Sequence, residues 1–191
     1  YQKAADQGDA IAQNSLGDMY EWGEGAPKDY KQAVRWFKKA ADQNYPSAQS
    51  NLGEMYQSGK GVAKDYKQAI TWYQKAADQD YSRAQGNLGF MYEFGLGVTK
   101  DYKQAVSWYQ KAADQGDAYA QVKLGYMYQN GRGVAKDLNL AFNWFEKSAN
   151  LGNARAQSKL GDIYQTGKGA NKDLTLAIEW YQKAADQGNS Y

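Results

Sequence analysis

The stretch GEGAPKD, from Gly23 to Asp29, has the residue types of a loop that could bind phosphate. Two glycines stand one residue apart, and a lysine and an acid follow them. In nucleotide-binding loops, glycines let backbone N–H groups approach phosphate oxygens, and a lysine adds positive charge. Such a loop follows a strand and opens directly into a helix. The flanking elements therefore decide between a phosphate site and a simple corner.

A second candidate chemistry uses the carboxylates of Asp18 and Glu54. If these acids lie on adjacent helical hairpins, they are about 8 to 10 Å apart, which is compatible with inverting glycoside hydrolysis. The chain has no histidine and no cysteine, so it lacks an imidazole base, a thiolate nucleophile and the usual zinc ligands. No other element of a hydrolase site is visible, and we predict no catalytic residues, no metal and no cofactor.

The charge balance argues against nucleic acid as a partner. There are 23 basic and 21 acidic residues, a formal net charge of +2, whereas phosphate neutralisation needs a strongly basic surface. No run of about 18 apolar residues occurs, so no membrane span is expected.

A repeat of 36 residues organises the chain. Leu-Gly occurs at 16, 52, 88, 124 and 160, and GEGAPKD returns in register as GKGVAKD, GLGVTKD, GRGVAKD and GKGANKD. Such a period predicts a solenoid. We expect an all-α, right-handed α-solenoid of about five helix-turn-helix repeats. Its expected parts are the end of a preceding repeat (1–8), five repeats (9–44, 45–80, 81–116, 117–152 and 153–188) and the start of a following repeat (189–191).

Each repeat contains two amphipathic helical patterns, and the glycine loop joins them. Asp29 stands at the N-cap of the second helix, and Gln32 three residues later completes a capping-box pattern. Gly23 ends the first helix, and Gly25 permits a second unusual backbone angle. Because this loop follows a helix and recurs five times, we interpret it as a corner. Asn44 and the weaker Asp80 replace glycine as the stop of the second helix.

The spacing resembles the Sel1-like repeat family, a relative of the tetratricopeptide repeat. The pattern A-x-x-x-L-G-x-x-Y-x-x-G-x-G-x-x-x-D-x-x-x-A-x-x-W-x-x-x-A-A runs from Ala48 to Ala77 and recurs, with Ser148 as a departure. The resemblance implies a right-handed superhelix and non-enzymatic scaffold or adaptor work through protein binding. In bacteria it also implies cell-envelope or host-contact processes, and it permits a periplasmic or secreted location.

One subgroup of that family has paired cysteines and is associated with β-lactam binding or hydrolysis. This chain lacks those cysteines, so the activity is not carried over. The two ends of the chain match partial repeats and supply no polar capping repeat. We therefore expect 1–191 to be cut from a longer array and to associate end to end.

A binding site is expected where the copies differ. On the first helix of each repeat, the variable positions form one face, which in stacked hairpins lines the concave side. Exposed aromatics and arginine are common anchors of interfaces. We predict a protein or peptide partner, with cations steering an acidic segment, at Trp22, Arg83, Phe90, Phe94, Tyr119, Lys123, Tyr126, Arg155 and Lys159. Phe90 and Tyr126 could instead cover neighbouring helices, and Trp22, Phe94 and Tyr119 could stack on sugar rings of a glycan or cell wall.

Two other recurring features are interpreted as structural. Lys39 and its equivalents lie near the ends of second helices, where cations complement the helix dipole. The pair Asp42-Gln43 and its equivalents are expected to need no special role.

Overall fold

Helices form all of the regular secondary structure in the computed structural model, which describes residues 1–188. The helices are α1 (Gln2–Asp6), α2 (Ala10–Trp22), α3 (Tyr30–Asp42), α4 (Pro46–Ser58), α5 (Tyr66–Ala77), α6 (Ser82–Phe94), α7 (Tyr102–Asp114), α8 (Ala118–Asn130), α9 (Leu138–Asn150), α10 (Ala154–Thr166) and α11 (Leu174–Ala185). The described range holds no strand, which confirms the all-α expectation. The prediction for 189–191 concerns residues outside that range.

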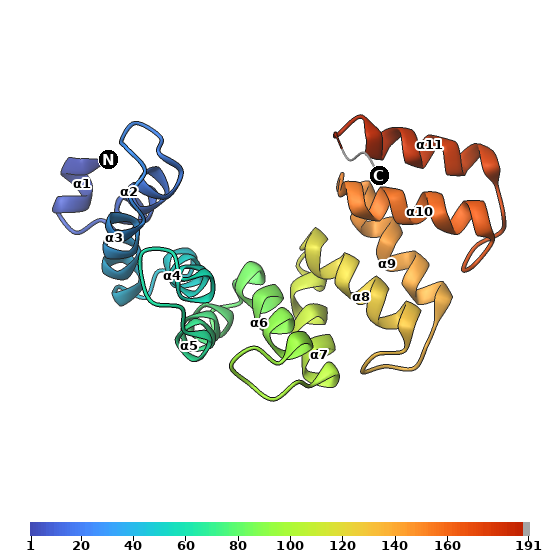
Figure 1. Cartoon of the computed structure of the whole chain (residues 1–191), viewed down its shortest axis with the longest axis horizontal. Helices are drawn as coiled ribbons and strands as arrows, with labels where there is room; N and C mark the ends of the chain where they lie inside the picture. Colours follow the sequence, from blue (N-terminus) through green and yellow to red (C-terminus); the bar gives the residue numbers. More distant parts are fainter. Residues whose placement is uncertain (189–191) are drawn as a thin grey trace. The chain divides into compact units, whose positions relative to one another are not determined.

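The helices group into two units, residues 1–100 and residues 101 onward, and each is described by itself. In the first unit α2 packs on α3, α3 on α4, and α4 on α5. In the second unit α8 packs on α9, α9 on α10, and α10 on α11, as the side-by-side helices in Figure 1 illustrate. We call α2, α4, α6, α8 and α10 the first helices and the others, apart from α1, the second helices. Within each unit the hairpins stack in chain order, as expected for a solenoid.

The glycine loops are corners between helices. Asp29 caps α3 by accepting hydrogen bonds from the N–H groups of Lys31 and Gln32 at 2.9 and 3.1 Å. Its own N–H donates to the carbonyl of Tyr20 at 2.9 Å. The reciprocal bond that the capping-box pattern assigned to Gln32 is thus replaced by a bond to the end of the preceding helix. The prediction that Asp29 is the N-cap of α3 is confirmed. The predicted second bond of the capping box, between the Gln32 side chain and the Asp29 N–H, is wrong.

Left-handed residues end both kinds of helix. Gly23 ends α2 with φ of 78°, and its N–H donates to the Met19 carbonyl. After the second helices, Asn44 and Asp80 have φ of 65° and 57° where other copies have glycine. Asparagine and aspartate tolerate this conformation better than other residues with a Cβ. The predicted helix stops are confirmed.

Close approach of paired helices depends on the glycine of each Leu-Gly pair. A Cβ on Gly125 would lie 2.5 Å from Cε1 and 2.8 Å from Cδ1 of Phe145, whose side chain is fully buried on α9. The ring occupies the space that a larger residue on α8 would need. The same fit recurs in the first unit, where Tyr73 lies over Gly53. This confirms that small residues let the helices pack closely.

Buried glutamines join neighbouring repeats, and the sequence analysis missed them. Gln49, only 1% exposed, donates from Nε2 to the Ala41 carbonyl at 3.3 Å and accepts from Gln79 Nε2 at 2.9 Å. Gln13 likewise accepts from Gln43 Nε2 at 2.7 Å. The expectation that Gln43 needs no special role is therefore wrong. The partners are 30 residues apart, so the chain pattern alone did not reveal the bond. We call this recurring arrangement the glutamine ladder.

The ladder is interrupted in the repeat that contains α8 and α9. Gln121 still donates to the Ala113 carbonyl at 3.2 Å. Its Oε1, however, is buried and has no hydrogen-bond partner within the described residues. The position that is glutamine at Gln43, Gln79 and Gln187 is Leu151 here, and its side chain is 59% exposed. The repeat therefore has an orphaned acceptor and an exposed leucine.

Replacing Leu151 with glutamine is expected to stabilise the protein by about 1 kcal/mol, because a buried acceptor regains a donor. Urea unfolding followed by circular dichroism measures the change. Leu140→Gln is the matched control, since Leu140 is also exposed and also replaces a repeat glutamine. A gain of equal size in the control would show that repeat consensus, and not the Gln121 oxygen, is responsible.

The recurring lysines near the ends of second helices have a second role. Lys75 Nζ lies 4.1 Å from the ring centroid of Trp72, one helical turn away, and Lys39 lies 4.0 Å from that of Trp36. These distances are those of cation–π contacts. The lysines therefore cover the repeat tryptophans, in addition to lying in the last turn of the helix.

Candidate functional site

The predicted partner residues all lie on first helices, at positions that vary between repeats. Trp22, Arg83, Phe90 and Phe94 belong to the first unit, on α2 and α6. The second unit holds the rest, on α8 and α10, and these are Tyr119, Lys123, Tyr126, Arg155 and Lys159. The predicted set is thus divided between two units, and each part is described separately.

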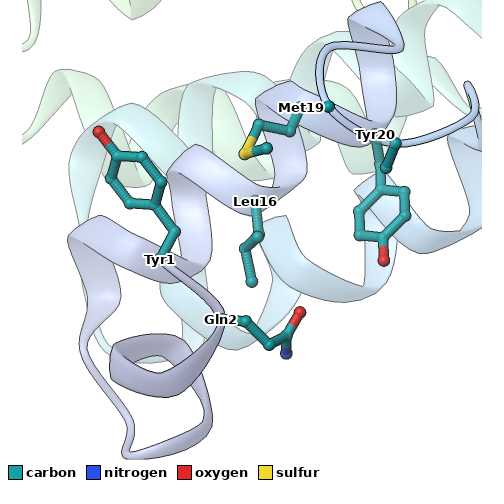
Figure 2. A pocket seen from close by; sticks show the side chains of 7 residues that line it. Tyr1, Gln2, Leu16, Met19 and Tyr20 are labelled. Atoms are coloured by element: carbon teal, nitrogen blue, oxygen red, sulfur yellow. The ribbon is translucent and has the colours of Figure 1, made fainter.

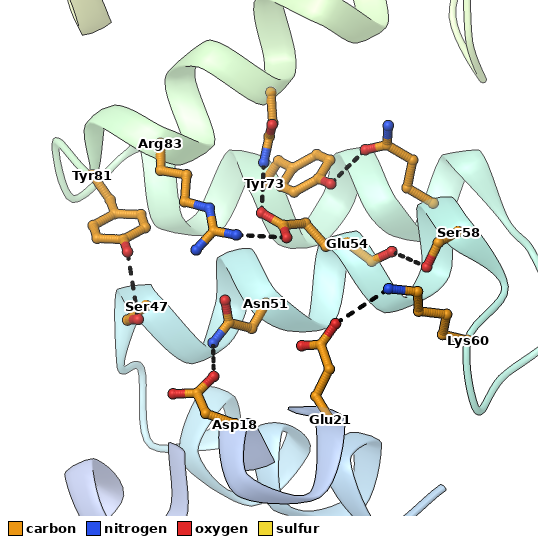
Figure 3. A network of polar contacts seen from close by, with 12 residues as sticks. Asp18, Glu21, Ser47, Asn51, Glu54, Ser58, Lys60, Tyr73, Tyr81 and Arg83 are labelled. Carbon is orange, nitrogen blue, oxygen red and sulfur yellow. Dashed lines mark hydrogen bonds and ion pairs between the residues drawn. The ribbon is translucent and has the colours of Figure 1, made fainter. Parts of the chain in front are cut away.

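In the first unit the Arg83 guanidinium forms an internal ion pair. Its Nη2 lies 2.7 Å from Oε2 of Glu54 on α4, and Asn87 Nδ2 donates to Glu54 Oε1 at 3.2 Å. Figure 3 shows Arg83 pointing from α6 to Glu54. An acidic partner segment would have to compete with Glu54 for this cation.

Asp18 lies in the same polar network (Figure 3). Its carboxylate accepts from Asn14 Nδ2 at 3.0 Å and from Asn51 Nδ2 at 3.2 Å, which links α2 to α4. The pKa of Asp18 is raised to about 6, mainly by burial and next by the nearby charge of Glu21, while Arg83 opposes the shift. The pKa of Glu54 is also raised by burial, against the lowering effect of Arg83 and Asn87.

The two carboxylates of the hydrolase hypothesis are therefore occupied by internal partners. Asp18 is held by asparagine amides, and Glu54 by Arg83 and Asn87. Within residues 1–188, no group of three or more acidic side chains is placed to hold a metal ion. The polar network of Asp18, Glu54 and their partners links the first helices α2, α4 and α6.

The raised pKa of Asp18 predicts a pH-dependent stability. The carboxyl group holds its proton up to about pH 6 in the folded protein, but only to an ordinary value of 3.8 in the unfolded chain. Between these values the folded state binds more protons, so the free energy of unfolding should fall as pH rises. Because the group is half-exposed, the fall attributable to Asp18 is expected to be about 1 kcal/mol.

The Asp18→Asn variant should remove that part of the pH dependence and keep the part due to Glu54. Urea unfolding at pH 4 and pH 7, compared between wild type and variant, measures it. An unchanged pH slope in the variant would show that Asp18 titrates normally.

Aromatic side chains are exposed near the ends of two first helices in this unit. Trp22 is 63% exposed and Phe94 is 51% exposed. The Phe94 ring lies 4.6 Å, centroid to centroid, from the half-buried ring of Phe90 one turn earlier. Phe90 therefore supports Phe94, and only the latter presents a large apolar surface.

The second unit has an open hollow of about 380 Å³ between α8 and the start of α10. Three of the predicted residues, Tyr119, Lys123 and Arg155, line it with Val122, Asn153 and Ala154. Tyr119 is 40% exposed, and its ring meets that of Tyr109 edge-on. Lys123 Nζ lies 5.5 Å from the Tyr119 ring centroid. The structure thus brings an exposed aromatic ring and two cations together.

Tyr126 and Lys159 lie on the same two helices but outside the residues that line the hollow. The Tyr126 ring meets the fully buried Phe145 ring edge-on at 5.2 Å. Lys159 Nζ pairs with Asp162 at 2.7 Å and lies 5.9 Å from the Tyr126 ring centroid. Tyr126 therefore contributes to packing, and a direct partner contact by either residue stays a prediction.

Sequence reasoning missed Asn153 as a residue of the hollow. The only signal was the variation of the first-helix N-cap, which is Asp9, Tyr45, Tyr81, Asp117 and Asn153 in successive repeats. An N-cap residue lies outside the helical periodicity that defines the variable face. The cap was therefore not included in the predicted face.

A second pocket, of about 260 Å³, lies between α1 and α2 (Figure 2). Leu16, Met19 and Tyr20 of α2 line it, with Tyr1 and Gln2 on the other side. One repeat later the start of α3 meets the following loop, since a Cβ on Gly61 would collide with the backbone of Tyr30.

Stacked helical hairpins with a variable first-helix face define the chain as an α-solenoid of the repeat-protein class. It matches the Sel1 repeat over residues 1–9, 10–45, 46–81, 82–117, 118–153 and 154–189. The chain belongs to the Sel1 repeat family, which generally provides scaffolds for protein–protein interaction and is typically non-enzymatic.

Solved structures support this assignment. The chain is similar to a Sel1 repeat protein from Oxalobacter formigenes, with 45% identity, a TM-score of 0.91, and coverage of 95% of this chain and 74% of that one. It is also similar to a protective antigen present in uropathogenic Escherichia coli strains displaying an SLR fold, with 42% identity and a TM-score of 0.88. There the match covers 98% of this chain but only 40% of the antigen.

A third relative is cysteine rich protein B of Helicobacter pylori. It is 29% identical with a TM-score of 0.55, over 70% of this chain and 96% of that one. The comparison with curated proteins gave no match. In the described part of this chain, no helix has the length and apolar character needed to span a membrane.

Proposed function

We propose that this chain is a non-enzymatic protein-binding module whose first-helix face holds a segment of a partner protein. The observation that carries the proposal is the hollow on α8 and α10, where the half-exposed Tyr119 ring lies beside Lys123 and Arg155. Aromatic anchors and arginine are enriched at binding hot spots, which lie in pockets. Val122 also lines the hollow, and it is buried at 3% exposure, so the main apolar surface there is the Tyr119 ring.

The rigid support of this face favours the same function. Tyr119 is the second residue of α8. The N-cap of this helix is Asp117, whose Oδ1 accepts a hydrogen bond from the Ala120 N–H at 2.8 Å. Arg155 is placed in the same way on α10 by the Asn153 cap. The caps fix the backbone at both residues, so little backbone entropy is lost there when a partner binds.

Selection of a peptide display library against the whole chain tests the proposal. We expect selected peptides to bind the wild type and to lose at least about tenfold in affinity for the Tyr119→Ala variant, the loss typical of an aromatic anchor. Thermal unfolding should change little, because the Tyr119 side chain is 40% exposed.

Ile178→Ala is the control for this experiment. Ile178 is 66% exposed, but it lies on the second helix α11 of the same unit. Its removal should leave the affinity unchanged. Peptides that bind wild type and Tyr119→Ala equally well would contradict the proposed site.

A further inference from the structure

Three side chains that line the hollow, those of Lys123, Asn153 and Arg155, offer hydrogen-bond donors. Arg155 is exposed and has no ion-pair partner among residues 1–188. Lys123 adds an ammonium group, held beside the Tyr119 ring. Asn153 uses its Oδ1 to accept from the Ala156 N–H at 3.0 Å, and this leaves its Nδ2 group as a donor. This set of two cations and an amide N–H donor matches an anion.

The N-cap of α10, Asn153, is neutral, whereas the two other first-helix caps that make a side-chain hydrogen bond, Asp9 and Asp117, are aspartates. Asp9 and Asp117 make the same bond to the third residue of their helices, with Oδ1 accepting from Ala12 and Ala120 at 2.6 and 2.8 Å. Asparagine and aspartate are about equally good N-caps. Helix stability therefore does not require asparagine at position 153. An aspartate there would cap α10 equally well but would add one negative charge at the hollow.

The acid on the adjoining face of α10 is already compensated. Asp162 lies one helical turn beyond Lys159, and the two form an ion pair at 2.7 Å. Asp162 also accepts from the Tyr181 hydroxyl at 2.8 Å. It is not among the residues that line the hollow. No aspartate or glutamate is among the residues that line the hollow.

We propose that the hollow on α8 and α10 binds a glutamate or aspartate side chain of a partner segment, and that Asn153 determines this preference by keeping the cap neutral. The inference rests on the proposed protein-binding function and assigns its charge specificity. A carboxylate at position 153 would face the incoming carboxylate, and juxtaposed like charges strongly oppose association.

Titration of the ¹⁵N-labelled whole chain with blocked hexaglutamate, hexaglutamine and hexalysine peptides tests this inference. We expect hexaglutamate alone to produce saturable shifts of the Lys123, Asn153 and Arg155 amide signals. In the Asn153→Asp variant, the dissociation constant for hexaglutamate should rise at least about tenfold. The melting temperature should be unchanged, because the new residue still caps α10.

Asn139→Asp is the matched control, since it adds the same charge to an exposed residue of α9 in the same unit. Its affinity for hexaglutamate should stay within about twofold of wild type, because Asn139 is not among the residues that line the hollow. Equal losses in the two variants, or equal binding of hexaglutamine, would overturn the inference. Arg155→Gln should also weaken hexaglutamate binding. If Asn153→Asp lowers the melting temperature, the affinity of the Arg155→Gln variant tests the inference in its place.

Failure of this inference is distinguishable from failure of the proposed function. Selected peptides that lose affinity for Tyr119→Ala but bind Asn153→Asp normally would support a protein-binding face without charge selection. Peptides insensitive to both variants would contradict both proposals.

Discussion

Replacing Gly133 with alanine is expected to lower the free energy of unfolding by about 2 to 5 kcal/mol, from two independent penalties. Gly133 is the second glycine of its loop and has φ of 73°, where an L-residue costs about 1 to 2 kcal/mol. Its Cβ would also lie 2.5 Å from the carbonyl carbon of Tyr102 and 2.9 Å from the N of Lys103. These are backbone atoms at the start of α7 and have no rotamer that could move away.

Gly116→Ala separates the two penalties. Gly116 has φ of 87°, but a Cβ there would meet no atom within 4 Å. Since alanine also reduces the entropy of the unfolded chain, its net cost should be only about 1 kcal/mol. Guanidinium unfolding of both variants measures the difference. Equal losses would show that the loop does not pack on the preceding repeat as closely as the structure indicates.

Replacing Gln49 with alanine is expected to cost at least about 2 kcal/mol, because buried polar groups lose their partners and a cavity is created. Gln49 is 1% exposed and binds the Ala41 carbonyl of the preceding repeat, Asn44 Oδ1 and Gln79 Nε2. One side chain therefore joins the end of α3 to the end of α5. Its removal should weaken stacking between two repeats as well as the packing of one helix.

Gln68→Ala is the control for this prediction, because Gln68 is an exposed residue in the first turn of α5. Surface substitutions of this kind usually change stability by less than about 0.5 kcal/mol. Chemical unfolding gives both values, and hydrogen exchange of the α3 and α5 amides locates the loss. A Gln49→Ala loss as small as that of the control would mean that solvent replaces the ladder bonds at no cost.

The predicted partner face was partly visible in the sequence. Comparison of the repeats identified Tyr119, Lys123 and Arg155, which the structure places around one hollow. The same comparison treated Arg83 as equivalent to them, although it is paired with Glu54 from a helix 29 residues earlier. Asn153 was not predicted from the sequence, because an N-cap residue lies outside the helical periodicity.

Signals within one repeat determined what the sequence could establish by itself. The 36-residue period, the Asp29 cap, the Gly23 stop and the small Gly17 depend on interactions inside one hairpin, and five copies repeat them. Only the tertiary structure decided which polar side chains are paired across repeats. Gln43 meets Gln13, and Asn51 meets Asn14, over separations of 30 and 37 residues. Such bonds depend on how adjacent hairpins stack, and no local pattern of residues encodes that geometry.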